Sequence, residues 1–162
     1  MTLIPDRYDR AWLWLGMIVV IGLGLRMAGA QGALWLDEAW SATLANDVGS
    51  PIGVFLNINH DNNHLLNSLW LQFLGDGASP MLARALSIVT GTLAIVAAAW
   101  VAAPRGRVAM LVTGWLFAVS PILVTLGSEA RGYAPMTLAL LVAVALVDNQ
   151  LAGSRFRAQA GL

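Results

Sequence analysis

The sequence contains neither cysteine nor lysine, and only 11% of its 162 residues are charged. The absence of cysteine excludes a disulfide framework, a thiolate nucleophile and a cysteine-based metal site. Charged residues make up about a quarter of soluble domains, whereas this chain is 58% hydrophobic. Basic and acidic residues balance at 9 each, so bulk charge gives no reason to expect nucleic acid as a partner. The composition predicts a polytopic membrane protein in contact with membrane lipids.

Four apolar runs approach the length of about 20 residues that a helix needs to cross a bilayer. The expected spans are residues 11–30, 81–103, 108–127 and 134–150. A signal peptide is the alternative for the first run, but the run is long for the apolar part of such a peptide, so we favour a retained helix. Within it, Arg26 is expected to extend toward water. Pro121 should kink the third span, because proline removes a helix hydrogen bond.

The segment 31–80 has a different composition and holds both histidines, most of the acids and most of the asparagines. Two pieces of it, residues 36–46 and 64–74, show apolar side chains at helical spacing. The apolar positions are Leu36, Trp40 and Leu44 in the first piece, and Leu66, Leu69, Trp70 and Phe73 in the second. Both pieces are too short to span, so we expect amphipathic surface helices, separated by loops at 49–51 and 57–63.

The distribution of arginine sets the expected orientation. With the N-terminus in the cytoplasm, the arginines on the inner side are Arg7, Arg10, Arg105, Arg107, Arg155 and Arg157. The segment 31–80 and the short polar turn 128–133 then both lie outside. The predicted fold is an all-α transmembrane bundle of the inner (plasma) membrane, crossing it several times, with residues 1–150 as the membrane module and 151–162 as a cytoplasmic tail.

The adjacent acids Asp37 and Glu38 follow the first span and are bracketed by Trp35 and Trp40. One interpretation is a helix start, where carboxylates interact favourably with the helix dipole. The other is chemical, because acids beside membrane helices are costly to bury, and a partly desolvated carboxylate can take a proton from a hydroxyl group. The position beside the span favours the second interpretation for Asp37.

The polar run from His60 to His64 contains two histidines at i, i+4 spacing, with Asp61 between them. That spacing can hold a divalent metal on a helix. A capped loop is the alternative. With two histidines and no cysteine in the chain, we favour binding of a phosphate or of sugar hydroxyls, and expect neither a bound metal nor another cofactor.

Arginine occurs at two further places on the expected outer side. Arg131 and Tyr133 lie in the turn 128–133, and Arg84 lies near the outer end of the second span. A guanidinium group suits a phosphate geometrically. The alternatives are an Arg131–Glu129 ion pair anchored by an interfacial tyrosine, and a purely structural Arg84.

In order along the chain, these features resemble a known family. They are a first span, Leu34-Trp35-x-Asp37-Glu38, a surface helix, a histidine entering a second surface helix, Arg84-Ala-Leu-Ser87, Ser120-Pro121, and Ser128-x-x-Arg131-x-Tyr133. The order is similar to the amino-terminal part of the GT-C glycosyltransferases that use polyprenyl-phosphate sugars, especially the protein O-mannosyltransferase and aminoarabinose-transferase type. The resemblance covers most of the chain.

The resemblance implies transfer of a sugar from a polyprenyl-phosphate donor to a lipid, protein or glycan acceptor on the outer face. In that family an acid of the first external loop is the catalytic base or orients the acceptor, which corresponds to Asp37. We count Glu38, which would line the site, as the second catalytic candidate, and expect Glu38→Gln to reduce transfer less than Asp37→Asn if Asp37 is the base. The substrate-binding residues would be His60, Asp61, His64, Arg84, Arg131 and Tyr133.

Two positions depart from the family pattern. The second surface helix opens with His64-Leu65-Leu66 where His-Pro-Pro is frequent, and the turn before the fourth span has Glu129 and Arg131 where many members have aspartate. Members usually have more spans, so we expect this chain to be an amino-terminal fragment or a shortened form. The alternative function is a non-catalytic membrane subunit or a transporter fragment, although transporters place ionisable groups near the bilayer midplane.

Overall fold

The computed structural model describes residues 7–59 and 63–159, and this part of the chain is helical and contains no strand. The helices are α1 (Arg7–Gly29), α2 (Leu36–Asp47), α3 (Pro51–Leu56), α4 (Leu65–Leu74), α5 (Pro80–Ala102), the short 3-10 turn η1 (Ala103–Arg105), α6 (Arg107–Val119), α7 (Pro121–Leu126) and α8 (Tyr133–Gln159). The expected all-α fold is therefore confirmed.

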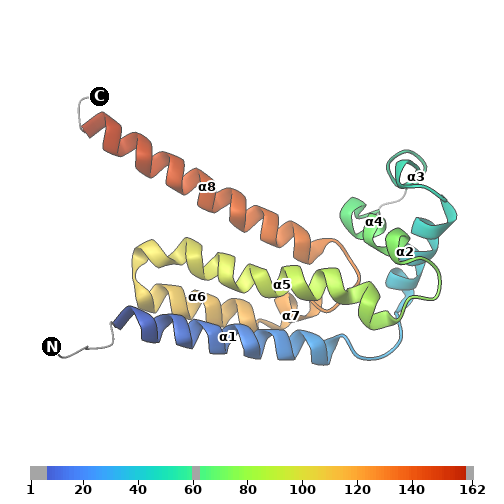
Figure 1. The fold of residues 1–162 in the computed structure, drawn as a ribbon, viewed down its shortest axis with the longest axis horizontal. Helices are drawn as coiled ribbons and strands as arrows, with labels where there is room; N and C mark the ends of the chain where they lie inside the picture. Colours follow the sequence, from blue (N-terminus) through green and yellow to red (C-terminus); the bar gives the residue numbers. More distant parts are fainter. Residues whose placement is uncertain (1–6, 60–62, 160–162) are drawn as a thin grey trace.

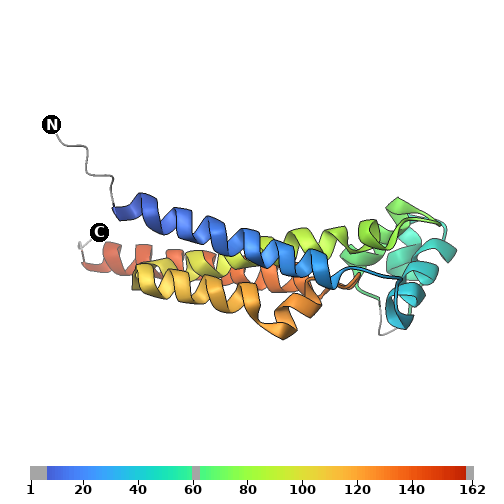
Figure 2. The same ribbon diagram turned by 90° about the horizontal axis from the view of Figure 1, so that it is seen from below.

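The long helices α1, α5, α6 and α8 run along the longest axis of the molecule, and α2, α3 and α4 form a cap at one end (Figure 1). Helix α5 is central, because it packs against α8, α6 and α1. The start of α1, the α5–α6 connection and the far end of α8 lie at the opposite end from the cap, and the second view shows the same arrangement (Figure 2). The turn between α7 and α8 lies near the cap.

Within the described part of the chain, three helical segments are long and apolar enough to cross a membrane, namely Arg10–Gly29, Pro80–Arg105 and Tyr133–Leu151. Large apolar side chains on them are exposed, among them Trp12, Val20 and Leu140. A contiguous apolar exterior of this kind is rare in soluble monomers and is the surface that lipid chains solvate. These segments indicate a membrane protein.

The predicted third span is divided in two. Helix α6 ends at Val119, Ser120 has a non-helical ψ of 121°, and α7 begins at Pro121. Proline is favoured at the first position of a helix, where no intrahelical donor is needed. The structure therefore has a complete break at Pro121 where the sequence predicts a kink.

Arg26 does not extend toward water, as its position near a helix end predicts. The side chain is 1% exposed and lies among α1, α6 and α7, where it donates hydrogen bonds to carbonyl oxygens including those of Gly22 (3.0 Å) and Phe117 (3.1 Å). Buried backbone carbonyl groups, among them that of Phe117, whose helical donor would be the missing amide of Pro121, provide enough acceptors to keep the guanidinium group inside the bundle.

The cap contains helices at both places where the segment 31–80 is expected to form them, α2 and α4, and adds α3. Ser50 accepts a hydrogen bond from the Gly53 amide at 3.1 Å, and Pro51 occupies the first helical position. The expected loop at 49–51 is thus the start of a helix, since serine followed by proline is a strong helix-start pattern. Gly75 ends α4 with a φ of 73°, which a residue without a side chain adopts readily.

Helix α4 turns its polar face inward. The buried residues are Asn67, Ser68 and Leu71, whereas Leu66 and Phe73 of the predicted apolar stripe are exposed. Two of the inward side chains donate hydrogen bonds: Asn67 Nδ2 donates to the Ala130 carbonyl at 2.8 Å, and the Ser68 hydroxyl donates to Asn63 Oδ1 at 2.9 Å. The outward apolar stripe is the arrangement expected of a helix lying on a lipid surface.

The cap is joined to the bundle through small side chains. Ala45 of α2, Leu71 of α4, Ala83 of α5 and Ala130 of the α7–α8 turn form one buried cluster. Small residues let backbones approach closely, so this cluster brings the segment after α1, the start of α5 and the turn 128–133 together.

Candidate functional site

Glu38 and Arg84 form the buried centre of the region where cap and bundle meet. Glu38 lies in the first turn of α2 and is 0% exposed, and Arg84 lies in the second turn of α5 and is 4% exposed. Arg84 Nε donates to Glu38 Oε1 at 2.9 Å, and Arg84 Nη2 donates to Oε2 at 2.5 Å. This is a bidentate, charge-assisted pair.

The remaining hydrogen-bonding capacity of the pair is also used. Arg84 donates to the carbonyl oxygens of Ala30 (2.8 Å), Gly32 (3.0 Å) and Ala33 (2.9 Å). Glu38 Oε1 accepts from the Ala130 amide at 2.6 Å, and Oε2 accepts from the Trp35 amide at 3.1 Å. An arginine has five N–H donors and a carboxylate about four lone-pair sites, so both side chains are saturated.

This saturation bears on the predicted roles of the pair. Burial raises the pKa of the Glu38 carboxyl, but the hydrogen bonds from Arg84, Ala130 and Trp35 outweigh burial and hold that pKa below its ordinary value. Arg84 has no N–H group left for a phosphate, and Glu38 has no lone pair left for a proton. The geometry therefore favours a supporting role over the substrate contacts that the sequence predicts for them.

Asp37, the neighbour of Glu38, points into a different environment. Its side chain is 36% exposed, and its Oδ2 lies 3.4 Å from Arg131 Nη1. The Arg131 guanidinium lies over the rings of Tyr133 (4.8 Å to the centroid) and Trp35 (5.7 Å), and Arg131 Nη2 donates to the Tyr133 hydroxyl at 3.1 Å. Two aromatic faces thus hold a cation beside a water-accessible carboxylate, an arrangement stabilised by cation–π attraction.

His64 joins this cluster through Tyr133. The two rings meet edge to face with centroids 4.8 Å apart. A side chain at Gly132 would bring its Cβ within 2.6 Å of His64 Cβ, so glycine is what allows this contact. Burial lowers the pKa of His64, and the charge of Arg131 lowers it further. His64 therefore favours its neutral form.

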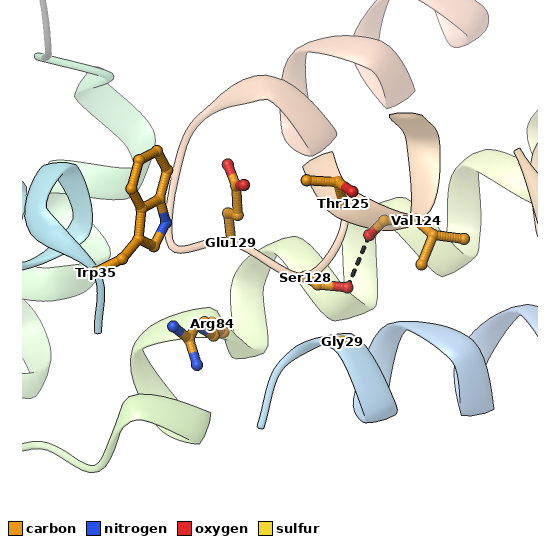
Figure 3. Close-up of a pocket in the computed structure, with 7 residues that line it drawn as sticks. All are labelled: Gly29, Trp35, Arg84, Val124, Thr125, Ser128 and Glu129. Carbon is orange, nitrogen blue, oxygen red and sulfur yellow. Dashed lines mark hydrogen bonds between the residues drawn. The ribbon is translucent and has the colours of Figure 1, made fainter. Parts of the chain in front are cut away.

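A pocket of about 310 Å³ opens beside the pair and contains a carboxylate that is only half-buried. Its lining residues are Gly29, Trp35, Arg84, Val124, Thr125, Ser128 and Glu129. In Figure 3 the Glu129 side chain extends away from Arg84, with the Trp35 ring on one side and Thr125 on the other. Burial raises the pKa of the Glu129 carboxyl; Glu38 and Asp37 add to this rise, whereas Arg131 and Arg84 oppose it.

Most of the predicted site residues meet in this region. Asp37, Glu38, His64, Arg84, Arg131 and Tyr133 are linked by the contacts described above. His60 and Asp61 lie outside the described residues. Within the described part of the chain, no group of three or more histidine or acidic side chains is placed to hold a metal ion.

Glu129 is the residue that the sequence analysis does not single out. The sequence presents it as an ion-pair partner of Arg131 and as an acid in the turn where many members of the resembled family have aspartate, on the face expected to hold Asp37. Its place in the pocket depends on the break before α7, because Val124, Thr125 and Ser128 line the same pocket. Comparisons with protein-family models, curated proteins and solved structures find no match to this chain.

Proposed function

We propose that this protein is a membrane glycosyltransferase, or its amino-terminal part, that transfers a sugar from a polyprenyl-phosphate donor to an acceptor hydroxyl on the outer face of the plasma membrane. The observation that carries the proposal is that the Asp37–Arg131 pair adjoins a pocket of about 310 Å³ through Trp35, because Arg131 lies over the Trp35 ring and Trp35 lines the pocket together with Glu129. The pocket lies at one end of helices long enough to cross a membrane. Carboxylates, a cation and an aromatic wall are the groups that such a transfer needs.

The proposed reaction breaks the bond between the anomeric carbon and the phosphate oxygen, and forms a bond from that carbon to the acceptor oxygen. Asp37 takes the proton of the acceptor hydroxyl as the new bond forms, a role worth about 10²–10⁴-fold in rate. The polyprenyl phosphate leaves with its negative charge. Arg131 stabilises that charge, since guanidinium pairs well with phosphate oxygens.

The pocket suits the sugar better than the phosphate. Among the described residues that line it, the only cation is Arg84, whose N–H groups are all bonded to protein acceptors. Trp35 offers an apolar aromatic surface, and Glu129 offers a carboxylate for sugar hydroxyls. A pocket with apolar walls and a few convergent polar groups is the usual form of a small-ligand site. The phosphate then lies toward Arg131, outside the sugar pocket.

The orientation of the chain supports an outer-face site. The turn 128–133 and the cap lie at the same end of the bundle, and the Arg-rich α5–α6 connection lies at the other end (Figure 1). Positive residues favour the cytoplasmic side. Asp37 and Glu129 are also at an end of the bundle, and not at its middle, where a transporter binds its substrate.

Donor binding is the first test. Purified protein in proteoliposomes is incubated with a radiolabelled polyprenyl-phosphate sugar, with free polyprenyl phosphate and free sugar as separate competitors. We expect saturable binding that weakens in Glu129→Gln and in Arg131→Gln and is unchanged in Asp76→Asn, an exposed acid that does not line the pocket. Binding no greater than that of empty vesicles, or equal binding by all variants, would contradict the proposal.

A further inference from the structure

The break between α6 and α7 leaves backbone carbonyl groups without their usual partners. In a continuous helix the Phe117 carbonyl would accept from the amide of residue 121, but that residue is proline and has no N–H. The non-helical Ser120 likewise removes the helical partner of the Ala118 carbonyl. An unpaired carbonyl in the low-dielectric interior of a membrane bundle is costly.

Arg26 of α1 supplies donors to the Phe117 and Ala118 carbonyls, and it also reaches the Leu123 carbonyl, which already accepts from the Gly127 amide at 3.1 Å. Its Nη2 donates to the Phe117 carbonyl at 3.1 Å and to the Leu123 carbonyl at 3.4 Å. Its Nη1 approaches the Ala118 carbonyl at 3.5 Å and donates to Gly22 of its own helix at 3.0 Å. One guanidinium group therefore bonds to carbonyls on both sides of the break, with Phe117 and Ala118 before it and Leu123 after it.

Glycines make room for this side chain. A Cβ at Gly127 would lie 2.6 Å from Arg26 Nε, and a Cβ at Gly91 would lie 2.9 Å from the same atom. Both contacts are closer than real Cβ atoms make. Because hydrogen bonds on both Nη atoms hold the guanidinium in place, it cannot move aside without losing them.

The same arginine is connected to the pocket. The Ser128 hydroxyl donates to the Arg26 backbone carbonyl at 3.0 Å, and Ser128 lines the pocket with Val124 and Thr125 of α7. The direction in which α7 leaves the break thus decides where these residues and Glu129 lie. We propose that Arg26 is a positioning residue, which takes the place of the Pro121 amide and holds the α6–α7 break so that α7 and the turn after it form the pocket.

A double-mutant cycle tests the exchange of donors. Arg26→Met removes the donors and keeps an apolar side chain, and Pro121→Ala restores an amide that can reach the Phe117 carbonyl. We expect Arg26→Met to lower the melting temperature markedly, and the same change in the Pro121→Ala background to cost less than half as much. Arg105→Met, at an exposed arginine that bonds within its own turn, is the control and should change little. Additive losses in the cycle would overturn the proposal.

The position of α7 is measured separately, with spin labels on cysteines introduced at Val108 and Ile122, both of which are exposed. In the Arg26→Met, Pro121→Ala variant we expect the label distance to move to that of a continuous helix, about 21 Å between backbone positions at 1.5 Å per residue. In Arg26→Met alone the distance distribution should broaden. A distribution identical to wild type in both variants would contradict a positioning role.

The last readout rests on the proposed function. The double variant should be nearly as stable as wild type, yet it should bind the polyprenyl-phosphate sugar at least tenfold more weakly, because the pocket residues of α7 have moved. Wild-type affinity in this variant would mean that Arg26 contributes stability alone. If the wild-type protein itself binds no donor, the proposed function fails, whereas the stability cycle and the label distances still decide the role of Arg26.

Discussion

A change of Glu38 to glutamine should destabilise the folded protein strongly, although it preserves the shape of the side chain. Glu38 accepts four hydrogen bonds, two on each carboxylate oxygen. Whichever oxygen becomes an amide NH₂, two of these contacts turn into donor–donor contacts, so no flip of the amide restores them. A hydrogen bond to a charged group contributes roughly 1.5–3 kcal/mol, which makes the expected loss roughly 3–6 kcal/mol. This range overlaps the cost of about 3–5 kcal/mol for breaking a buried ion pair.

Equilibrium unfolding in mixed micelles, followed by circular dichroism, measures this loss. Asp76→Asn is the matched control, because Asp76 is an exposed acid of the α4–α5 connection. The pH dependence gives a second readout. Since the pKa of Glu38 lies below its ordinary value of 4.5, its contribution is present above that pH and is lost as the pH falls through the lower folded value. If Glu38→Gln is within about 0.5 kcal/mol of wild type, as a surface substitution would be, the saturated pair does not hold the site together.

Three further predictions concern the fold and the cluster around Tyr133. Cysteines at Asp76 and Arg105 should react with an impermeant reagent from opposite faces of the membrane; reaction from one face would remove the common outer site. Because the pKa of His64 is lowered from 6.5, stability should fall as the pH drops below that value, and His64→Phe should abolish this slope; an unchanged slope would assign it to other groups. Gly132→Ala should lower the melting temperature, since the new Cβ would lie 2.6 Å from His64 Cβ, whereas an unchanged value would show that α4 can shift freely.

The helices follow from patterns that act over short distances in the sequence. Apolar runs predict α1, α5 and α8, and helical spacing predicts α2 and α4 to within one residue at each end. Capping is equally local, yet it is easily missed; α3 begins at a serine–proline pair in a stretch that otherwise resembles a loop. The break at Pro121 is also a local effect of proline, but we infer that the full separation of α6 from α7 depends on the hydrogen bonds donated by Arg26 of α1.

The partners of the buried charges could not be predicted from such patterns. Glu38 bonds to Arg84, 46 residues away, and to the Ala130 amide, 92 residues away. Arg26 bonds to carbonyl groups 91 to 97 residues away. These pairings depend on how the helices pack. The sequence therefore indicates that the charged residues have a role, but it does not separate those that bond within the protein from those that are open to a ligand.

Asp37 and Glu38 show this difference within one dipeptide. From the sequence both acids are candidates, with Asp37 favoured as the base; the turn of α2 directs Glu38 into the protein and leaves Asp37 beside Arg131 with 36% of its side chain exposed. The buried Glu38 carboxylate therefore has a supporting role, whereas the exposed Asp37 carboxylate is accessible to a ligand. The same reasoning adds Glu129, whose importance appears only once α7 and Trp35 are placed around it.

The central claim is that Asp37 accepts the proton of the acceptor hydroxyl during sugar transfer. The direct measurement is the initial rate of transfer from a polyprenyl-phosphate sugar in membranes containing matched amounts of wild type, Asp37→Asn and, as a control, Asp47→Asn at the exposed end of α2. We predict that Asp37→Asn inserts and folds normally but loses about 10²–10⁴-fold in rate, while Asp47→Asn transfers like wild type. Transfer by Asp37→Asn at the wild-type rate would show that Asp37 only begins a helix.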